Sequence, residues 1–211
     1  GASTSITPIF EQGTATLDNA IGSVASGTAY TISPSVTTTY NLTVTNSAGK
    51  TVSQSVTVYV NSISLTSQPI GATVNTNDFN SMSANAIGTG VITYQWYDAN
   101  GILGGYVGSI FRSNAAGNFY VIATSTLNGT VGVATSTSAT VTVVPAPSIT
   151  SLIPDNYGIG LGSSTNLTPT FSNGVGVINP GNITVTSGNA ITISPTVTTN
   201  YVLSVTNLAG T

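Results

Sequence analysis

The sequence predicts an all-β protein built from tandem β-sandwich domains. Three observations predict this fold class: apolar residues alternate with polar ones, turn-forming residues separate the alternating runs, and one long stretch of the chain occurs twice. Hydrophobic residues make up 40% of the 211 residues, which is enough to build cores. At about 100 residues per sandwich, this length corresponds to two or three small domains.

The alternation has a period of two. Tyr40, Leu42 and Val44 alternate with polar residues, and Val141 and Val143 do the same further along the chain. Side chains of a strand point to opposite faces in turn, so this period places one set in a core and the other in solvent. Turn signals, several with Asn-Gly, separate the runs and let neighbouring strands fold back on each other. They lie at residues 47–49, 99–101, 127–129 and 172–174.

The repeat has a long period. Residues 1–49 align without a gap onto residues 162–210, and about half of the aligned positions are identical. The residues between the two copies differ from both, which gives the domain order A, B, A. We expect a modular array in which each domain folds around its own small core. The predicted boundaries are residues 1–60 for domain A, 61–146 for domain B and 147–211 for the second domain A.

The two copies of domain A differ at their ends. The second copy opens with an apparent first strand, residues 148–153, that the first copy lacks, and the first copy closes with an apparent last strand, residues 51–60, that the second copy lacks. We therefore expect two incomplete terminal domains and an excerpt of a longer A-B-A-B chain. Strand donation between molecules is the disfavoured alternative, because both strands that could be donated are needed by their own domains.

Domain B contains a tryptophan and a tyrosine at informative positions. Trp96 lies in the alternating run Tyr-Gln-Trp-Tyr, and Tyr120 follows in Gly-Asn-Phe-Tyr roughly two dozen residues later. These segments resemble strands C and F of an immunoglobulin domain. The resemblance implies that Trp96 lies in the core and that Tyr120 hydrogen-bonds back to the backbone. It also implies that Ile122 and Ala84 occupy the positions of the missing disulfide.

Domain A carries the patterns Ser-Pro-x-Val-Thr-Thr-x-Tyr and Val-Thr-Asn-x-Ala-Gly in both copies. They resemble the immunoglobulin-like repeats of large bacterial secreted and cell-surface proteins. The resemblance implies an extracellular, cell-surface location. It also places Tyr40 and Tyr201 where a corner tyrosine lies.

Charge excludes several classes of protein. The formal net charge is −3, and Lys50 and Arg112 are the only cations. A nucleic-acid-binding protein or a polybasic membrane-binding segment needs clustered cations, so neither partner is expected. No apolar run approaches the roughly 20 residues of a transmembrane helix. Ser and Thr supply the polar surface instead, and Thr and Val favour strands.

The sequence predicts no enzyme, and no catalytic, cofactor-binding or metal-binding residue. It has no His and no Cys, which removes the usual triads and thiolate or imidazole metal sites. In the second copy of domain A, Ser172 and Asn179 replace Glu11 and Asp18, so we interpret the acids as solvated turn residues. The five acids are Glu11, Asp18, Asp78, Asp98 and Asp155.

Several residues are also candidates for other kinds of site. Single carboxylates in Asn-rich turns are candidate calcium ligands, with Asp155 the best placed. Lys50 follows a strand, as in an intramolecular isopeptide bond. Four Asn-x-Thr sequons are candidate glycosylation sites, namely Asn41, Asn128, Asn166 and Asn182. Three aromatic residues in turn or Gly-rich regions are candidates for a sugar-binding platform, namely Tyr106, Phe111 and Tyr157.

Two functional interpretations follow. The first is a structural or adhesive module of a repetitive surface protein, such as a stalk, surface layer or filament, whose partners are neighbouring repeats or further copies of itself. Low charge favours this interpretation, because little ion desolvation opposes close packing. The second is a binding module in which loops of domain B hold a glycan or a protein.

Overall fold

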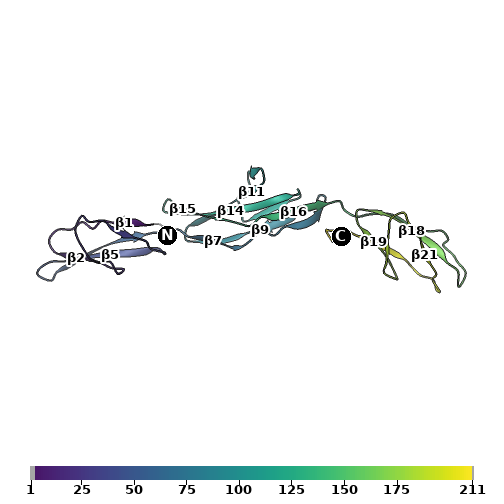
Figure 1. The fold of residues 1–211 in the computed structure, drawn as a ribbon, viewed down its shortest axis with the longest axis horizontal. Helices are drawn as coiled ribbons and strands as arrows, with labels where there is room; N and C mark the ends of the chain where they lie inside the picture. Colours follow the sequence, from purple (N-terminus) through teal and green to yellow (C-terminus); the bar gives the residue numbers. More distant parts are fainter. Residues whose placement is uncertain (1–2, 211) are drawn as a thin grey trace. The chain divides into compact units, whose positions relative to one another are not determined.

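The computed structural model describes residues 3–210, which form strands β1 to β22 and no helix (Figure 1). This confirms the predicted all-β class. No helix long and apolar enough to cross a membrane occurs among these residues.

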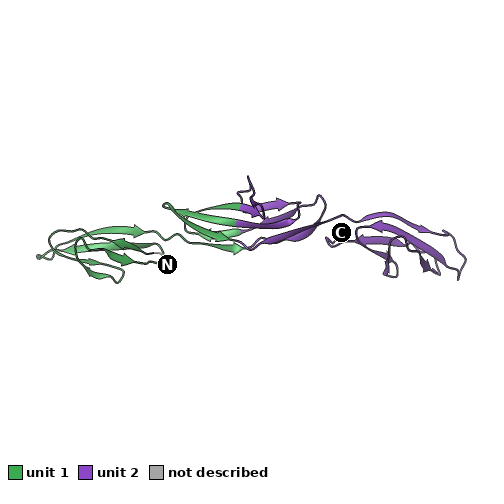
Figure 2. Ribbon diagram, turned by 45° about the horizontal axis from the view of Figure 1, so that its top comes forward, with its two compact units in different colours: residues 1–67, 85–95, 122–135 green, residues 68–84, 96–121, 136–211 purple. Residues whose placement is uncertain are grey.

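The chain divides into two compact units, shown in green and purple in Figure 2. Unit 1 contains the chain up to Ser67 together with Asn85–Gln95 and Ile122–Thr135. Unit 2 contains Gln68–Ala84, Trp96–Val121 and the chain from Ser136 onwards. Two long strands, β11 (Val91–Asp98) and β14 (Gly117–Leu127), contribute residues to both units.

The N-terminal segment, residues 3–60, belongs to unit 1 and forms two antiparallel sheets. Its strands are β1 (Thr4–Ile6), β2 (Thr14–Leu17), β3 (Gly22–Val24), β4 (Tyr30–Ile32), β5 (Thr38–Thr45) and β6 (Thr51–Val58). β1 pairs with β4, and the second sheet has the order β3-β2-β5-β6. Alternate apolar side chains meet in one core, formed by Ala15, Leu17, Val24, Ile32, Tyr40 and Val44.

The C-terminal segment, residues 147–210, belongs to unit 2 and also forms two antiparallel sheets. Its strands are β17 (Ser148–Pro154), β18 (Thr165–Ser172), β19 (Val175–Asn179), β20 (Ile183–Val185), β21 (Ile191–Ile193) and β22 (Val202–Thr206). The sheet orders are β17-β18-β21 and β20-β19-β22. The core consists of Leu167, Ile178, Val185, Ile193 and Leu203.

The two copies of the repeat share strand order and register. Thr4 pairs with Ile32 as Thr165 pairs with Ile193, which is the same pairing 161 residues on. The pairings of β2 with β3 and with β5 recur in the same way between β19 and its neighbours β20 and β22. The prediction that residues 1–49 and 162–210 share one fold is confirmed for the residues described.

A pair of hydrogen bonds recurs where the chain passes between the sheets of each copy. The Ser26 Oγ accepts a hydrogen bond from the Phe10 N–H at 2.9 Å, and the Gly27 N–H donates to the Pro8 carbonyl at 2.7 Å. In the second copy Ser187 bonds Phe171 at 2.8 Å, and Gly188 bonds Pro169 at 2.7 Å. We call this arrangement the Ser-Gly clamp. Gly27 and Gly188 have φ of 76° and 79°, a region that favours glycine.

The central strands lie between these segments in sequence. Unit 1 holds β7 (Ile63–Ser67), β10 (Asn85–Gly88) and β15 (Thr130–Thr135); unit 2 holds β8 (Ala72–Asn75), β9 (Asn80–Ser83), β12 (Gly101–Ile102), β13 (Ile110–Ser113) and β16 (Ala139–Val144). The main sheet has the order β12-β11-β14-β16-β8, and β15 also pairs with β14. β8 runs parallel to β16, while β7 pairs with β10 and β9 with β13.

Trp96 lies on β11, belongs to unit 2 and is fully buried, as predicted. Its Nε1–H donates to the Gly108 carbonyl at 2.8 Å, and its ring lies 5.4 Å from that of Phe111. Ala84 is buried too, as the resemblance implied. A buried indole with a satisfied N–H is a stable anchor for a sandwich core.

The predicted roles of Tyr120 and Ile122 are wrong. On β14 the odd-numbered residues Phe119, Val121 and Ala123 are buried, so Tyr120 and Ile122 belong to the opposite face. Tyr120 stacks on Tyr97, with centroids 5.1 Å apart, and has no backbone hydrogen bond from its hydroxyl within residues 3–210. Because side chains alternate along a strand, an error of one residue exchanges the side chains predicted to face the core with those predicted to face away from it.

The corner roles of Tyr40 and Tyr201 are wrong as well. Tyr40 is buried and Tyr201 is half-buried, but neither hydroxyl makes a hydrogen bond within the described residues. Other tyrosines make such bonds. The Tyr30 hydroxyl accepts from the Ala25 N–H at 2.7 Å, and the Tyr94 hydroxyl accepts from the Ala86 N–H at 3.0 Å.

Trp96→Ala is expected to destabilise the protein by about 3–5 kcal/mol, because it leaves a large cavity and an unpaired Gly108 carbonyl. The measurement is urea unfolding of the whole chain followed by circular dichroism. The control is Ile102→Ala, which alters an exposed side chain and should stay within about 0.5 kcal/mol of the parent. Equal effects would contradict the anchoring role of Trp96.

Ser26→Ala and Ser187→Ala should each cost about 1 kcal/mol, because each removes a hydrogen bond of the Ser-Gly clamp. Ser23→Ala is the matched control, since the exposed Ser23 side chain makes no hydrogen bond within the described residues. Thermal unfolding measures all three. A Ser26→Ala melting curve identical to that of Ser23→Ala would show that the clamp does not stabilise the fold.

Candidate functional site

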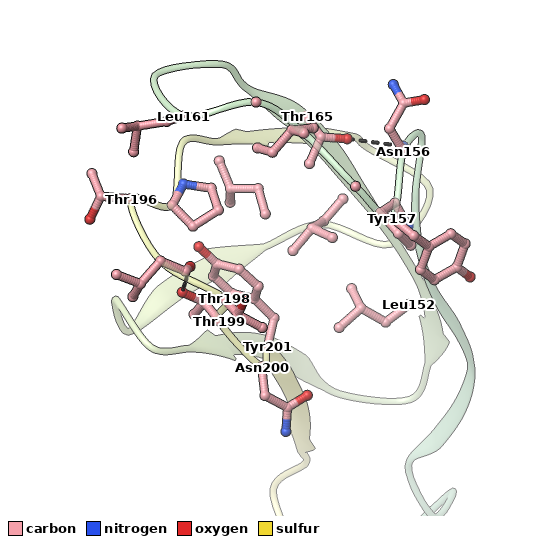
Figure 3. Close-up of a pocket in the computed structure, with 18 residues that line it drawn as sticks. Leu152, Asn156, Tyr157, Leu161, Thr165, Thr196, Thr198, Thr199, Asn200 and Tyr201 are labelled. Carbon is pink, nitrogen blue, oxygen red and sulfur yellow. Dashed lines mark hydrogen bonds between the residues drawn. The ribbon is translucent and has the colours of Figure 1, made fainter.

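A cavity of about 530 Å³ lies in the C-terminal segment (Figure 3). Two stretches surround it: the connection between β17 and β18, and residues 195–201 ahead of β22. Leu152, Leu167 and Tyr201 supply apolar surface, while threonine hydroxyls and backbone groups supply polar surface. Tyr157 is 89% exposed and points away from the cavity in Figure 3.

The cavity is lined by apolar side chains and neutral polar groups. Its lining residues in the described chain include no charged side chain. The Thr165 hydroxyl accepts from the Asn156 N–H at 3.1 Å, and the Thr199 hydroxyl donates to the Val197 carbonyl at 2.8 Å. These bonds hold the two surrounding stretches in shape.

Asp18 is the acid with the most defined environment. Its carboxylate accepts hydrogen bonds from the Asn41 N–H at 2.9 Å, the Asn41 side chain at 2.7 Å and the Asn19 side chain at 2.8 Å. The Asn41 backbone bond, followed by the Asn41 side chain, lowers the pKa of Asp18 below its usual 3.8. Asp18 therefore joins the end of β2 to β5, and its interpretation as a solvated turn residue was incomplete.

The three calcium candidates make hydrogen bonds close to their own turns. Asp98 accepts from the Asn100 N–H at 2.7 Å, Asp78 from the Asn75 side chain at 3.1 Å, and Asp155 from the Asn166 side chain at 2.8 Å. No group of three or more His, Cys, Asp or Glu residues that could hold a metal ion occurs in residues 3–210. Each carboxylate is one oxygen donor group in a turn, whereas calcium takes six to eight oxygen ligands.

Lys50 and the sequon asparagines differ in the contacts that their side chains or backbone make. Lys50 is exposed, and its N–H bonds the Asn46 side chain in a turn at 3.0 Å. Among the sequon residues, the Asn41 side chain bonds Asp18, and the Asn166 side chain bonds Asp155 and Thr192. A glycan on the Nδ2 of Asn41 or Asn166 competes with the hydrogen bond that this nitrogen donates to Asp18 or Asp155, so Asn128 and Asn182 are the sequons better suited to modification.

The predicted aromatic platform does not form. Tyr106 packs edge-on against Phe111 at 4.7 Å, and Phe111 is buried between Trp96 and Phe119. Tyr157 belongs to the C-terminal segment and is not part of this cluster. The stacked pair of Tyr97 and Tyr120 was missed, and correct parity on β14 was the signal that could have found it.

The hydrogen bonds of Asp18 predict an acid-sensitive N-terminal segment. A carboxylate whose pKa is lowered in the folded state stabilises that state above its unfolded pKa, and this stabilisation is lost as pH falls through the folded pKa. Asp18→Asn should therefore lower the melting temperature at pH 7, and this effect should shrink as the pH falls through the folded pKa of Asp18 and the carboxylate becomes protonated. Glu11→Gln is the matched control. A pH-independent effect of Asp18→Asn would contradict the assignment.

No protein-family model and no curated protein sequence matches this chain. Among solved structures, an I-band fragment of titin is similar, with a TM-score of 0.51 and 15% identity, covering 90% of this chain and 77% of that fragment. Immunoglobulin domains 1–5 of Sidekick-1 match with a TM-score of 0.46 and 15% identity over 92% of this chain. This chain spans 50% of the Sidekick-1 structure. The likeness to titin shows the fold: the chain consists of tandem immunoglobulin-like β-sandwich domains.

Proposed function

We propose that this chain is a structural or adhesive module of a repetitive extracellular surface protein. The observation that carries the proposal is the repeat: one sandwich, with the same strand order, register and Ser-Gly clamp, occurs once before and once after a different set of strands in the sequence. Tandem repetition of small folded units builds length without new chemistry, which suits stalks, layers and filaments. The patterns of domain A that resemble bacterial surface repeats support the extracellular location.

The proposed units are residues 1–60, 61–146 and 147–211. Their support is the pairing of strands, because β1–β6, β7–β16 and β17–β22 each pair among themselves within the described residues. Each terminal segment also has its own core cluster. A fold that closes its pairings within a short stretch of chain is the expected unit of a modular array.

The surface supports packing against further copies of such units. Hydroxyl pairs bridge exposed positions of β5 and β6, with Thr39 and Thr57 at 2.8 Å and Thr43 and Ser53 at 3.1 Å. With 3% charged residues, a meeting of two such surfaces strips water from few ions. Neighbouring repeats or other molecules of the same protein are therefore the proposed partners.

A second candidate function is binding of a glycan or protein by loops of the central strands. Exposed apolar side chains gather in the stretch from β12 to β13, where Ile102, Val107 and Ile110 accompany the 47% exposed Tyr106. An exposed apolar group of this kind is a common feature of interaction sites. This alternative uses the same fold and differs in predicting a saturable ligand.

Surface labelling tests the proposed function. An antibody raised against residues 3–210 should label intact, non-permeabilised cells of the source organism, and protease treatment of those cells should remove the signal. An antibody to a cytoplasmic protein is the control. Labelling that requires permeabilisation would overturn the proposal.

A glycan array tests the second function. A bound glycan favours that function if Tyr106→Ala abolishes binding and Tyr59→Ala does not. Tyr59 is the matched control because it is 49% exposed, close to the exposure of Tyr106.

A further inference from the structure

The Asn-x-Ala-Gly turn has the same internal hydrogen bonds in both copies of the repeat. The Asn207 Oδ1 accepts from the Ala209 N–H at 2.9 Å, and the Gly210 N–H donates to the Asn207 carbonyl at 3.0 Å. In the first copy Asn46 makes the two corresponding bonds, both at 3.0 Å. The turn therefore uses the Oδ1 and the carbonyl of its asparagine and leaves the side-chain Nδ2 for another partner.

The Nδ2 of Asn207 donates to residues outside the turn. It bonds the Asn75 Oδ1 at 2.7 Å and the Pro145 carbonyl at 2.9 Å. Asn75 ends β8 and Pro145 follows β16, so both acceptors come from the central strands, whereas Asn207 follows β22 of the C-terminal segment. All three residues belong to unit 2. Asn46, by contrast, is exposed, and its Nδ2 makes no hydrogen bond within residues 3–210.

The acceptor Asn75 is fixed in its orientation. It is only 7% exposed, and its Nδ2 donates to the Asp78 carboxylate at 3.1 Å. Its carbonyl accepts from the Asp78 N–H at 3.0 Å. Turning the amide over would set its oxygen against the Asp78 carboxylate and its nitrogen against the Asn207 Nδ2, which leaves buried groups without partners. The Asn75 Oδ1 is therefore held in place to receive a donor.

We propose that the Asn75 Oδ1 and the Pro145 carbonyl form a docking site for the Asn-x-Ala-Gly turn, and that Asn207, seated there, holds the C-terminal segment in one orientation on the central strands of unit 2. We call Asn75, Pro145 and Asn207 the asparagine latch. Domains joined by a small contact move relative to each other by default, so one defined orientation needs specific bonds of this kind. The proposal rests on the hydrogen bonds of unit 2 and is independent of the proposed function.

The surroundings of the latch leave the orientation to these polar bonds. The Asn173 Nδ2 donates to the Ala146 carbonyl at 3.0 Å, and a proline stands on each side of Ala146, which restricts the connection through fixed φ. A cavity of about 450 Å³ adjoins the latch, so apolar side chains do not pack closely there. Its lining residues are Asn75, Ala146, Pro147, Ile149 and Val205.

Asn207→Asp opens the latch and preserves the turn. An aspartate keeps the side-chain oxygen that accepts from the Ala209 N–H, but at pH 7 it replaces the Nδ2 donor by a charged oxygen. That oxygen faces the Asn75 Oδ1 and the Pro145 carbonyl, which are acceptors and repel it. Asn46→Asp is the matched control, because it makes the same change in a turn whose Nδ2 has no hydrogen-bond partner in the described chain.

Residual dipolar couplings of the backbone amides, measured on the weakly aligned whole chain, report the orientation. In the parent chain and in Asn46→Asp, strands β8 and β16 should share one alignment tensor with β17–β22. In Asn207→Asp the C-terminal strands should lose the shared tensor and take a smaller one of their own. Two separate tensors in the parent chain, or one shared tensor retained in Asn207→Asp, would overturn the proposal.

A second variant covers the case in which Asn207→Asp unfolds the C-terminal segment, which collapsed amide signals of β19 and β22 would reveal. Asn207→Ser keeps a hydroxyl that accepts within the turn but is too short to reach Asn75. It should separate the tensors in the same way, with Asn46→Ser as its control. A folded Asn207→Ser chain with one shared tensor would contradict the latch.

Discussion

The Ser-Gly clamp is the interaction on which the repeated sandwich depends. A two-sheet fold must carry the chain from one sheet to the other, and backbone groups at the crossing lose their ladder partners. Ser26 and Gly27 supply partners for Phe10 and Pro8 at that crossing. With the crossing fixed, the alternating apolar residues of β2 and β5 face those of β1 and β4. The clamp recurs at Ser187 and Gly188, where many strand residues differ, so both copies fix the crossing in the same way.

Low charge shapes the rest of the polar network. With two cations in the whole chain, hydroxyls and amides do the work that ion pairs do elsewhere. In the central strands the fully buried Ser125 hydroxyl donates to the Asn61 side chain at 2.8 Å and accepts from the Gly90 N–H at 3.0 Å. Neutral hydrogen bonds of this kind cost less desolvation than buried charges. Asp18 differs from the other acids because its carboxylate accepts three hydrogen bonds from amide groups.

Sequence periodicity predicted the fold class, the repeat and the burial of Trp96, because each depends on local pattern. It did not predict which face of β14 is buried, since Phe119, Tyr120, Val121 and Ile122 are all apolar or aromatic and alternation is lost. Neither did it predict the cavity, which depends on how the connection between β17 and β18 is placed against residues 195–201. Asp18 illustrates the same limit. Its partner Asn41 lies 23 residues away, and only the pairing of β2 with β5 brings them together.

The edges of the sheets show how a chain with few charges restricts unwanted pairing. Proteins commonly protect open edges with Lys or other charged residues, or by keeping edge strands short. Here the second device dominates, because β1, β3, β4, β20 and β21 have three residues each. In the terminal segments β6 and β17 are longer edges, of 8 and 7 residues, and Val52 on β6 is 71% exposed on the core-facing parity. Short edges bind a passing strand weakly, so in the terminal segments the capacity for pairing lies mainly with the longer edge strands.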